Sequence, residues 1–333
     1  MTALVSDIGG TNTRLGLVEN GQLVPATLDS FANDHFDSYE AVVETYLDRL
    51  GQRRLEACCI ALAAVPTPNG AQLTNRDWTI RRSRMQALTG APFIDFLNDF
   101  EALGYSLIAP ERLETQAVFA SAVPAPPKAT RMVLGAGTGF NAAACYWPAF
   151  GAAPHVAAAE CGHTTLAIEG EEERELQAAL AAGRGRASVE RALSGNGLRE
   201  IYGWICARDG RPGNAATSAE ITQAATAGTD EQAVAAAHLF LRLLGRVVGD
   251  LALTFLPYGG IYLYGGVCRA LAPLVVATDT FRDAFRAKGR MGPFMADFEA
   301  HLLVDDRVAL AGCVEWLGIA AASRANAPVL RPA

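Results

Sequence analysis

Residues 3–18, ALVSDIGGTNTRLGLV, decide the fold at the start of the chain. An apolar run ends at Asp7, two glycines follow, and a second apolar run begins after Arg14. Short apolar runs on either side of a glycine turn predict a β-hairpin with strands over residues 3–8 and 14–18. Glycines in such a turn also let backbone N–H groups approach an anion closely. The stretch is therefore either an ordinary tight hairpin or a phosphate-binding loop.

A second hairpin of this kind is predicted near the middle of the chain. A strand begins at residues 132–134 and runs into Gly135-Ala-Gly-Thr-Gly139, and residues 141–147 return. Two such loops could hold one triphosphate. A dinucleotide-binding fingerprint is the alternative, but it needs G-x-G-x-x-G at the start of a helix, and strand-like residues follow both loops. The near-repeat suggests two related halves.

Strands and helices alternate along the rest of the chain, which predicts an α/β fold. A length of 333 residues suggests about two domains. Segment 123–130 contains three prolines and is the linker candidate. We expect further strands at residues 57–63, 93–97 and 261–264, and helices at residues 100–108 and 309–322. Capping-box spacings start other helices at Asp37 with Glu40, Thr217 with Glu220, and Thr229 with Gln232.

The charge balance narrows the kind of partner. The chain carries 28 Lys and Arg against 35 Asp and Glu, a formal net charge of −7. Nucleic acid and anionic membranes need clustered positive charge, so we expect neither as a partner. Lysine occurs only at positions 128 and 288, and neither lies in G-x-x-x-x-G-K-[ST], which excludes a P-loop.

The cysteines and the first residues bear on the location of the protein. Seven cysteines, an odd number, occur without a C-x-x-C pair, which fits a reducing cytosol. Met1 is followed by strand-like residues instead of a basic leader, and no apolar run reaches about 18 residues. We therefore expect a soluble, cytoplasmic protein.

Asn98 and Asp99 directly follow the strand expected at residues 93–97. Ligands of open α/β sheets bind at the carboxyl ends of the strands. There Asp99 could accept a proton from a hydroxyl group, and Asn98 could orient that substrate through its amide. The alternative is a helix N-cap, because a helix is expected directly afterwards, and the two roles are compatible.

A third polar cluster is Glu160-Cys-Gly-His163. Its residue types suggest a metal at first sight, but a structural zinc site needs four ligands and no second cluster matches this one. Hydrogen bonds to sugar hydroxyls fit Glu160 and His163 better. Glu190 is a further candidate for such a bond, and the alternative is a solvated glutamate at a helix start.

Taken in order, these motifs resemble the bacterial glucokinase family. Each motif alone is modest, and the ordered set is specific and covers nearly the whole chain. The segments that carry the resemblance are DIGGTNTR (7–14), LTNRDW (73–78), LNDFEA (97–102), GAGTG (135–139), ECGH (160–163), ERALSG (190–195), Gly259-Gly260, Gly265-Gly266 and AKGR (287–290).

The resemblance implies an α/β protein with the actin-like ATPase (ribonuclease H-like) fold and two domains around a cleft. In this family the C-terminal helix returns to the first domain. We therefore expect a small domain of residues 1–108 and 306–333 and a large domain of residues 109–305. The resemblance further implies ATP and Mg²⁺ as cofactors, a small-molecule sugar as substrate and a homodimer as the assembly.

The resemblance also implies roles for individual residues. Asp99 matches the family's catalytic base, and Asn98, Asp99, Glu160, His163 and Glu190 match its sugar-binding residues. Asp7 is the expected Mg²⁺ residue, through water. The positions that match the phosphate-binding loops and the glycines near the nucleoside are Ser6, Asp7, Ile8, Gly9, Gly10, Thr11, Gly135, Gly137, Thr138, Gly139, Gly265 and Gly266.

The chain departs from the family's usual pattern near the sugar-binding motifs. Cys161 and Ala159 stand where glycines are usual, and Asn141 stands where a glycine is common. Asn196 replaces a proline. These departures bear on the identity and affinity of the sugar more than on the type of reaction.

We therefore expect ATP-dependent phosphorylation of D-glucose to glucose 6-phosphate, with Asp99 as the general base. One alternative is a kinase for another hexose or an amino sugar. The other is a catalytically silent sugar-binding regulator. The absence of a cysteine-rich zinc motif and of an N-terminal DNA-binding helix-turn-helix from the sequence disfavours a regulator.

Overall fold

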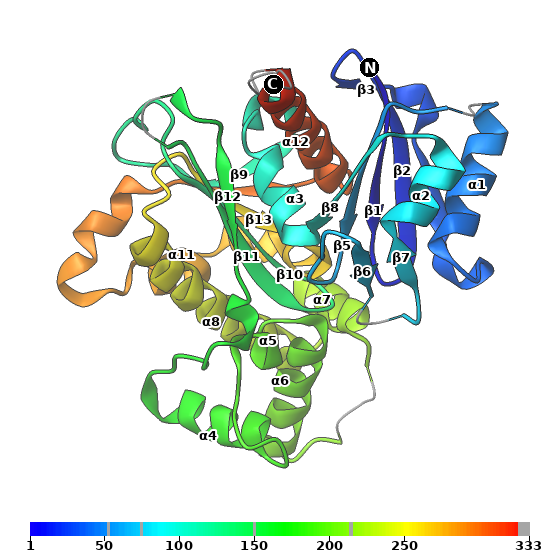
Figure 1. Ribbon diagram of the computed structural model, residues 1–333. Helices are drawn as coiled ribbons and strands as arrows, with labels where there is room; N and C mark the ends of the chain where they lie inside the picture. Colours follow the sequence, from blue (N-terminus) through cyan, green and yellow to red (C-terminus); the bar gives the residue numbers. More distant parts are fainter. Residues whose placement is uncertain (52–53, 74–75, 149–150, 213–215, 326–333) are drawn as a thin grey trace. The chain divides into compact units, whose positions relative to one another are not determined.

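The chain forms two compact units in a computed structural model (Figure 1). The structure describes residues 1–51, 54–73, 76–148, 151–212 and 216–325. Unit 1 comprises the described residues of Met1–Leu113, Pro148–Val156 and Asp305–Ala333, and unit 2 those of Glu114–Trp147 and Ala157–Val304. The domain boundaries expected from the sequence, after residues 108 and 305, stay a prediction.

Unit 1 is built on a mixed sheet with the strand order β3-β2-β1-β5-β8, and β4 pairs with β2. The predicted first hairpin is confirmed, because β1 and β2 run antiparallel with Asp7 opposite Arg14. Strands β1, β5 and β8 are parallel. The strands are β1 (Thr2–Ile8), β2 (Asn12–Glu19), β3 (Gln22–Leu23), β4 (Asp29–Ala32), β5 (Ala57–Leu62) and β8 (Phe93–Asn98). A separate small hairpin consists of β6 (Gly70–Gln72) and β7 (Thr79–Arg81).

The helices of unit 1 are α1 (Tyr39–Leu50), α2 (Arg82–Thr89), α3 (Asp99–Ser106) and α12 (Val308–Ala325). Short 3₁₀ turns are η1 (Pro25–Thr27), η2 (Asn33–His35) and η3 (Pro110–Arg112). Helix α12, red in Figure 1, packs beside α3, in cyan. Gly312 allows this approach, because a Cβ there would lie 1.7 Å from the carbonyl oxygen of Ala102. Helix α12 therefore returns to the unit that contains the first strands.

Unit 2 is built on a second sheet, with the order β12-β11-β10-β13-β14-β9. The second predicted hairpin is confirmed, because β10 and β11 are antiparallel, and β13 lies parallel to β10 on its other side. The strands are β9 (Thr115–Phe119), β10 (Arg131–Ala136), β11 (Phe140–Tyr146), β12 (His155–Ala158), β13 (Ile261–Tyr264) and β14 (Ala300–Leu303).

Helices form the rest of unit 2. Gly245 and Gly249 in α8 let α11 approach closely, because a Cβ at Gly245 would lie 2.3 Å from the carbonyl oxygen of Phe281. The helices are α4 (Gly170–Ala181), α5 (Val189–Ala192), α6 (Gly195–Arg208), α7 (Ser218–Ala227), α8 (Glu231–Phe255), α9 (Gly266–Ala270), α10 (Ala272–Ala277) and α11 (Thr280–Arg286), with 3₁₀ turns η5 (Cys161–His163), η6 (Gly289–Met291) and η7 (Pro293–Asp297). Within the described ranges, no helix combines the length and the apolar character needed to cross a bilayer.

Two of the expected helix starts are wrong by one residue. Ser38, not Asp37, caps α1, and its hydroxyl accepts a hydrogen bond from the Ala41 N–H. Asp230, not Thr229, caps α8. The capping box of Thr217 is confirmed. Where two polar residues are adjacent, backbone conformation decides which one caps, and the sequence spacing does not.

The Pro-rich segment 123–130 is not a linker between the two units. It connects β9 to β10, and both strands belong to the sheet of unit 2. The chain has already entered that unit at Glu114. Proline here marks a loop within one unit, which composition alone does not distinguish from a boundary between two.

Candidate active site

The first glycine loop joins β1 to β2 in unit 1. The Gly9 N–H donates to the Asn12 carbonyl oxygen at 3.0 Å, which closes the turn. Gly10 and Thr11 are exposed at its tip. Ser6 and Ile8 are instead buried in β1, and the Ser6 hydroxyl lies 2.6 Å from the Tyr39 hydroxyl. The loop therefore offers its backbone to a ligand, whereas Ser6 already has a partner in the core.

Asp7 is buried at the end of β1, beside Arg14. Its Oδ2 lies 3.5 Å from the Arg14 guanidinium, which also contacts Asp306 at 3.3 Å. Burial raises the pKa of Asp7 to about 6, although Arg14 opposes the shift. The charged form of this carboxylate is thus only partly compensated by its neighbours.

This environment fits a divalent cation. Mg²⁺ prefers carboxylate and water oxygens and keeps several of its waters. A buried carboxylate with a raised pKa would gain from a nearby positive charge, because the charge offsets the cost of desolvation. The residues present are therefore compatible with the role of Asp7 that the family resemblance implies.

Asn98 and Asp99 lie where β8 ends and α3 begins. Asn98 is the N-cap of α3, and its Oδ1 accepts from the Phe100 and Glu101 N–H groups at 3.0 and 3.4 Å. Glu101 completes a capping box. The predicted cap is confirmed, and it holds the first turn of α3 in place. Asp99 is the next residue and is half-buried at that turn.

The second glycine loop, between β10 and β11, is held by several backbone contacts within unit 2. The Gly195 N–H donates to the Gly137 carbonyl oxygen at 2.8 Å, and the Gly137 N–H donates to that of Gly139 at 2.9 Å. Gly265 follows β13 with φ +103°, and a Cβ there would lie 2.4 Å from the Ala136 carbonyl oxygen. The structure thus brings residues 135–139 and the pair Gly265-Gly266 together. The sequence motifs, taken separately, did not show this proximity.

Glu190 braces this loop from α5. Its Oε2 accepts a hydrogen bond from the Phe140 N–H at 3.0 Å. A Cβ at Gly139 would lie 2.5 Å from the same oxygen, so the close approach requires glycine. Glu190 is half-buried and bonded to the glycine hairpin, in contrast to a merely solvated glutamate.

Glu160 is the N-cap of the turn η5 and His163 is its last residue, and this turn packs against α5 and β11. Both side chains are more than half exposed, with 4.0 Å between Oε2 and Nε2. A Cβ at Gly162 would lie 2.0 Å from the Phe140 carbonyl oxygen and 3.4 Å from the Glu190 Cβ. Glu160, His163 and Glu190 therefore belong to one cluster in unit 2.

Two departures from the family pattern contact each other in this cluster. The buried Asn141 Oδ1 accepts from the Cys161 N–H at 3.2 Å and lies 3.5 Å from the Cys161 sulfur. Burial raises the pKa of the Cys161 thiol to about 11, so the thiol stays protonated and can donate. The two changes therefore act together, because the amide anchors the start of the η5 turn to β11.

Comparison with known proteins identifies the family of the chain. The glucokinase family model matches residues 4–319. A glucokinase of Pectobacterium atrosepticum is 33% identical over 321 residues, which cover 94% of this chain and 96% of that protein. This chain belongs to the glucokinase family.

Solved structures extend the likeness to the fold. The crystal structure of a glucokinase from an Antarctic psychrotroph has a TM-score of 0.81 at 26% identity and covers 95% of this chain and 98% of that one. A glucokinase from Balamuthia mandrillaris, solved in complex with glucose, has a TM-score of 0.80 at 21% identity, with 94% and 92% covered. The actin-like ATPase fold and its two-domain organisation, predicted from the family resemblance, are confirmed.

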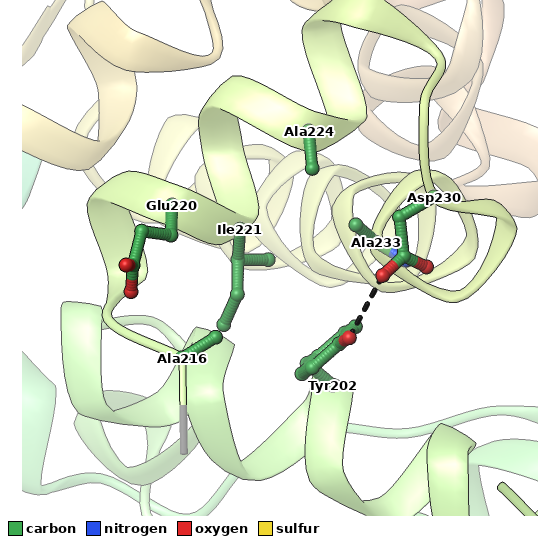
Figure 2. A pocket seen from close by; sticks show the side chains of 7 residues that line it. All are labelled: Tyr202, Ala216, Glu220, Ile221, Ala224, Asp230 and Ala233. Atoms are coloured by element: carbon green, nitrogen blue, oxygen red, sulfur yellow. Dashed lines mark hydrogen bonds between the residues drawn. The ribbon is translucent and has the colours of Figure 1, made fainter. Parts of the chain in front are cut away.

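A pocket of about 430 Å³ in unit 2 contains none of the residues assigned to the glucokinase site (Figure 2). Its polar side chains already have structural partners. Tyr202 donates to Asp230 at 2.8 Å, Asp230 caps α8, and Glu220 closes the capping box of α7. The remaining lining is apolar, with Ile221 and alanines. We assign it to helix packing.

Asn33 is an important residue that sequence reasoning missed. It lies in η2, is fully buried, and hydrogen bonds to the first glycine loop. No local motif marks it, because its partners lie about twenty positions earlier. The pairing of β4 with β2 brings it there, with Ala32 opposite Asn12. Arg76, from the LTNRDW motif, donates to the Asn33 carbonyl oxygen in η2. Residues 74–75 of that motif lie outside the described residues.

Proposed function

We propose that this chain catalyses ATP-dependent phosphorylation of D-glucose to glucose 6-phosphate. The observation that carries the proposal is the match to the glucokinase family over residues 4–319, together with the polar residues that the chain keeps at each family motif. The two glycine hairpins supply backbone donors, and the polar cluster of unit 2 supplies groups suited to sugar hydroxyls.

Asp99 is the general base in this proposal. The 6-hydroxyl of glucose gives its proton to the Asp99 carboxylate as the oxygen forms a bond to the γ-phosphorus of ATP. The bond from that phosphorus to the β,γ-bridging oxygen breaks, and ADP leaves. The capping box of Asn98 and Glu101 supports this role, because it orders the turn that carries Asp99.

The phosphates are bound at the loops of residues 6–11 and 135–139. In the first loop the donors are the Gly10 and Thr11 N–H groups, because residues 6–8 are paired in β1 and the Gly9 N–H donates to Asn12. The N–H groups of glycine turns present fixed dipoles to the developing charge, which lowers the barrier without reorganisation during the reaction. Gly265 and Gly266 lie near the nucleoside. Asp7 would hold Mg²⁺ through water, and the ion would neutralise charge on the phosphates.

Asn98, Glu160, His163 and Glu190 join Asp99 in binding the sugar. Carboxylates and an imidazole are suited to hydroxyls because they accept or donate hydrogen bonds in fixed directions. The exposed side chains of Glu160 and His163 support this role, since a ligand can reach them. We also propose that the protein is cytoplasmic and forms a homodimer.

The decisive experiment is ADP formation from ATP and Mg²⁺ with a panel of hexoses and amino sugars, compared as kcat/KM. We expect glucose to have the highest value. A higher value for another sugar would favour the alternative kinase. Glucose-dependent stabilisation against heat with no ADP release would favour a silent sugar-binding protein. Neither alternative is favoured by the comparisons, which find relatives named glucokinase.

A further inference from the structure

Asn33 makes four hydrogen bonds to the first glycine hairpin. Its Nδ2 donates to the Gly9 carbonyl oxygen at 2.8 Å and to that of Gly10 at 3.4 Å. Its Oδ1 accepts from the Thr13 hydroxyl at 2.8 Å, and its backbone N–H donates to the Thr11 carbonyl oxygen at 2.8 Å. One buried side chain thus holds both sides of the turn.

The partners determine which way the Asn33 amide is oriented. Carbonyl oxygens accept hydrogen bonds and cannot donate them, so the NH₂ group must face Gly9 and Gly10. The amide oxygen then faces the Thr13 hydroxyl, which can donate. Aspartate lacks the NH₂ donors when ionised, and leucine lacks both functions, although their side chains are similar in size. Only asparagine meets all three side-chain contacts at this size.

These bonds also orient the donors of the loop. In a trans peptide the carbonyl group of one residue and the N–H of the next point in opposite directions. The described residues contain no cis peptide. Asn33 draws the Gly9 and Gly10 carbonyl groups toward itself, so the Gly10 and Thr11 N–H groups point away from it. Gly10 and Thr11 are exposed, and those two N–H groups hydrogen bond to nothing in the part of the chain that the structure describes.

We propose that Asn33 is the positioning residue that aims the Gly10 and Thr11 N–H groups at an ATP phosphate. The inference rests on the proposed function, in which this loop binds phosphate. Asn33 does not touch the nucleotide, and it acts through the two peptide groups that it holds. The class of ligand is a polyphosphate, because paired N–H donors on a glycine turn suit an anion with several oxygens.

Arg76 contacts the backbone of Asn33, whose side chain contacts the loop. Its guanidinium donates to the Asn33 carbonyl oxygen at 3.4 Å and forms an ion pair with Asp34. This contact gives the LTNRDW motif a role, since its arginine holds the turn that holds the phosphate loop. Substitution of Arg76 is therefore expected to act in the same direction as substitution of Asn33, but less strongly.

The test compares Asn33→Leu and Asn33→Asp with the wild-type chain. We measure dissociation constants for AMP-PNP with Mg²⁺ and for glucose separately, and the KM of each substrate. We expect AMP-PNP affinity and the KM of ATP to worsen about tenfold or more, and glucose affinity to change less than about threefold. A general loss of structure would weaken both ligands, so the split between them identifies positioning.

Thr89→Val is the matched control. Thr89 is a buried polar residue of unit 1, bonded to Met85 and Ala91 and remote from the loop in its contacts. This variant should lose stability while AMP-PNP affinity stays near the wild-type value. If Asn33→Leu does not fold, Asn33→Asp decides, because it keeps the shape and the acceptor and replaces the NH₂ donors with a charged carboxylate oxygen. Loss of AMP-PNP affinity in the uncharged Asn33→Ala as well excludes the added charge as the cause.

Several outcomes would overturn the proposal. Unchanged AMP-PNP affinity in a folded Asn33 variant would do so, as would an equal loss in Thr89→Val. The proposed function fails separately, if the wild-type chain forms no ADP with any hexose. In that case AMP-PNP binding by the wild-type chain and Asn33→Asp still tests whether Asn33 aims the loop.

Discussion

Single residues in this chain combine structural and chemical roles at adjacent positions. Asn98 caps α3 through its side-chain oxygen, and its Nδ2 donates to the Ala64 carbonyl oxygen at 3.3 Å. The cap leaves Asp99 in the first turn of the helix, where the positive end of the helix dipole favours a carboxylate. Asn98 can therefore cap the helix and still lie beside Asp99 as part of the proposed sugar site.

Asp99→Asn tests the proposed base. Asparagine has nearly the same shape but cannot take the hydroxyl proton at neutral pH. We expect kcat to fall by about 100-fold or more, while glucose affinity stays within about tenfold. ADP release measures the first quantity, and the change of tryptophan fluorescence with glucose measures the second.

Asp37→Asn is the control for that substitution. Asp37 is exposed, and it does not cap α1 because Ser38 does. The same chemical change there should leave turnover near the wild-type value. Near-normal turnover in Asp99→Asn would remove Asp99 from the mechanism.

Asp7 predicts a dependence of stability on pH. Its pKa is raised by burial from 3.8 to about 6 in the folded chain. Between these values the folded state binds more protons than the unfolded state, so Asp7 makes the free energy of unfolding fall as pH rises through this window. A shift of about two units corresponds to about 3 kcal/mol as an upper estimate.

Urea unfolding of the wild-type chain and Asp7→Asn from pH 4 to pH 8, without Mg²⁺, measures this effect. The neutral amide removes the titration, so the variant should gain stability relative to the wild type as pH rises from about 4 to 6, and the gain should persist above 6. A constant difference across the range would show that Asp7 does not titrate in this way. Adding Mg²⁺ should narrow the difference if Asp7 holds the ion.

At the scale of elements, short turns tied to strand ends build the site. The η5 turn is joined to β11 by Asn141, and residues 164–166 pair with residues 187–189, which leads into α5 and Glu190. Glu160, His163 and Glu190 are thereby carried by one connected piece of unit 2. The hydrogen bonds of the η5 turn and of the 164–166 to 187–189 pairing hold these three residues relative to one another.

Asn141→Ala is predicted to loosen the η5 turn. The Cys161 N–H loses its acceptor, so we expect the KM of glucose to rise about two- to tenfold with little change in the KM of ATP. Cys161→Ala should have a smaller effect, because the backbone N–H remains. Asn141→Asp keeps the acceptor oxygen and should restore most of the affinity. An unchanged KM in Asn141→Ala, or the reverse order of effects, would refute the anchoring role.

At the scale of the whole molecule, the chain builds two units that each contain a glycine hairpin within a mixed sheet. In both, an antiparallel pair is followed by a parallel strand: β2-β1-β5 in unit 1 and β11-β10-β13 in unit 2. The two halves inferred from the repeated hairpin therefore share the hairpin and also the parallel strand beside it. Helix α12 belongs to the first unit, so unit 1 combines residues from both ends of the described chain.

Gly312→Ala tests the packing of that last helix. The added methyl group would overlap the Ala102 carbonyl oxygen, so α12 must move away from α3. We expect a loss of about 1–3 kcal/mol in the free energy of unfolding. Gly318→Ala, in the same helix, has no heavy atom within 4 Å of the new Cβ and should gain up to about 1 kcal/mol from helix propensity. Equal effects of the two substitutions in urea unfolding would contradict this packing.

Much of the fold and the composition of the site could be predicted from the sequence. Both glycine hairpins, the strands before Asn98 and Gly265, and the last helix follow from apolar runs bounded by glycine and polar residues, because these patterns depend on neighbours in the chain. The caps of α1 and α8 were assigned one residue too early. The spacing to Glu40 and Gln232 fits Asp37 and Thr229, whereas Ser38 and Asp230 cap the helices without a Glu or Gln three residues later. The Pro-rich segment was placed wrongly, because a loop within a unit and a linker share one composition.

The sequence by itself determined the elements, the family and the set of polar residues from which a kinase site is proposed. Only the tertiary structure decided which of them support one another. The bonds of Asn33 to the loop at residues 9–13, of Asn141 to Cys161 and of Glu190 to Phe140 join positions about 20 to 50 residues apart. Such contacts leave no local periodicity, because they depend on strand pairing and on how closely backbones approach at glycines.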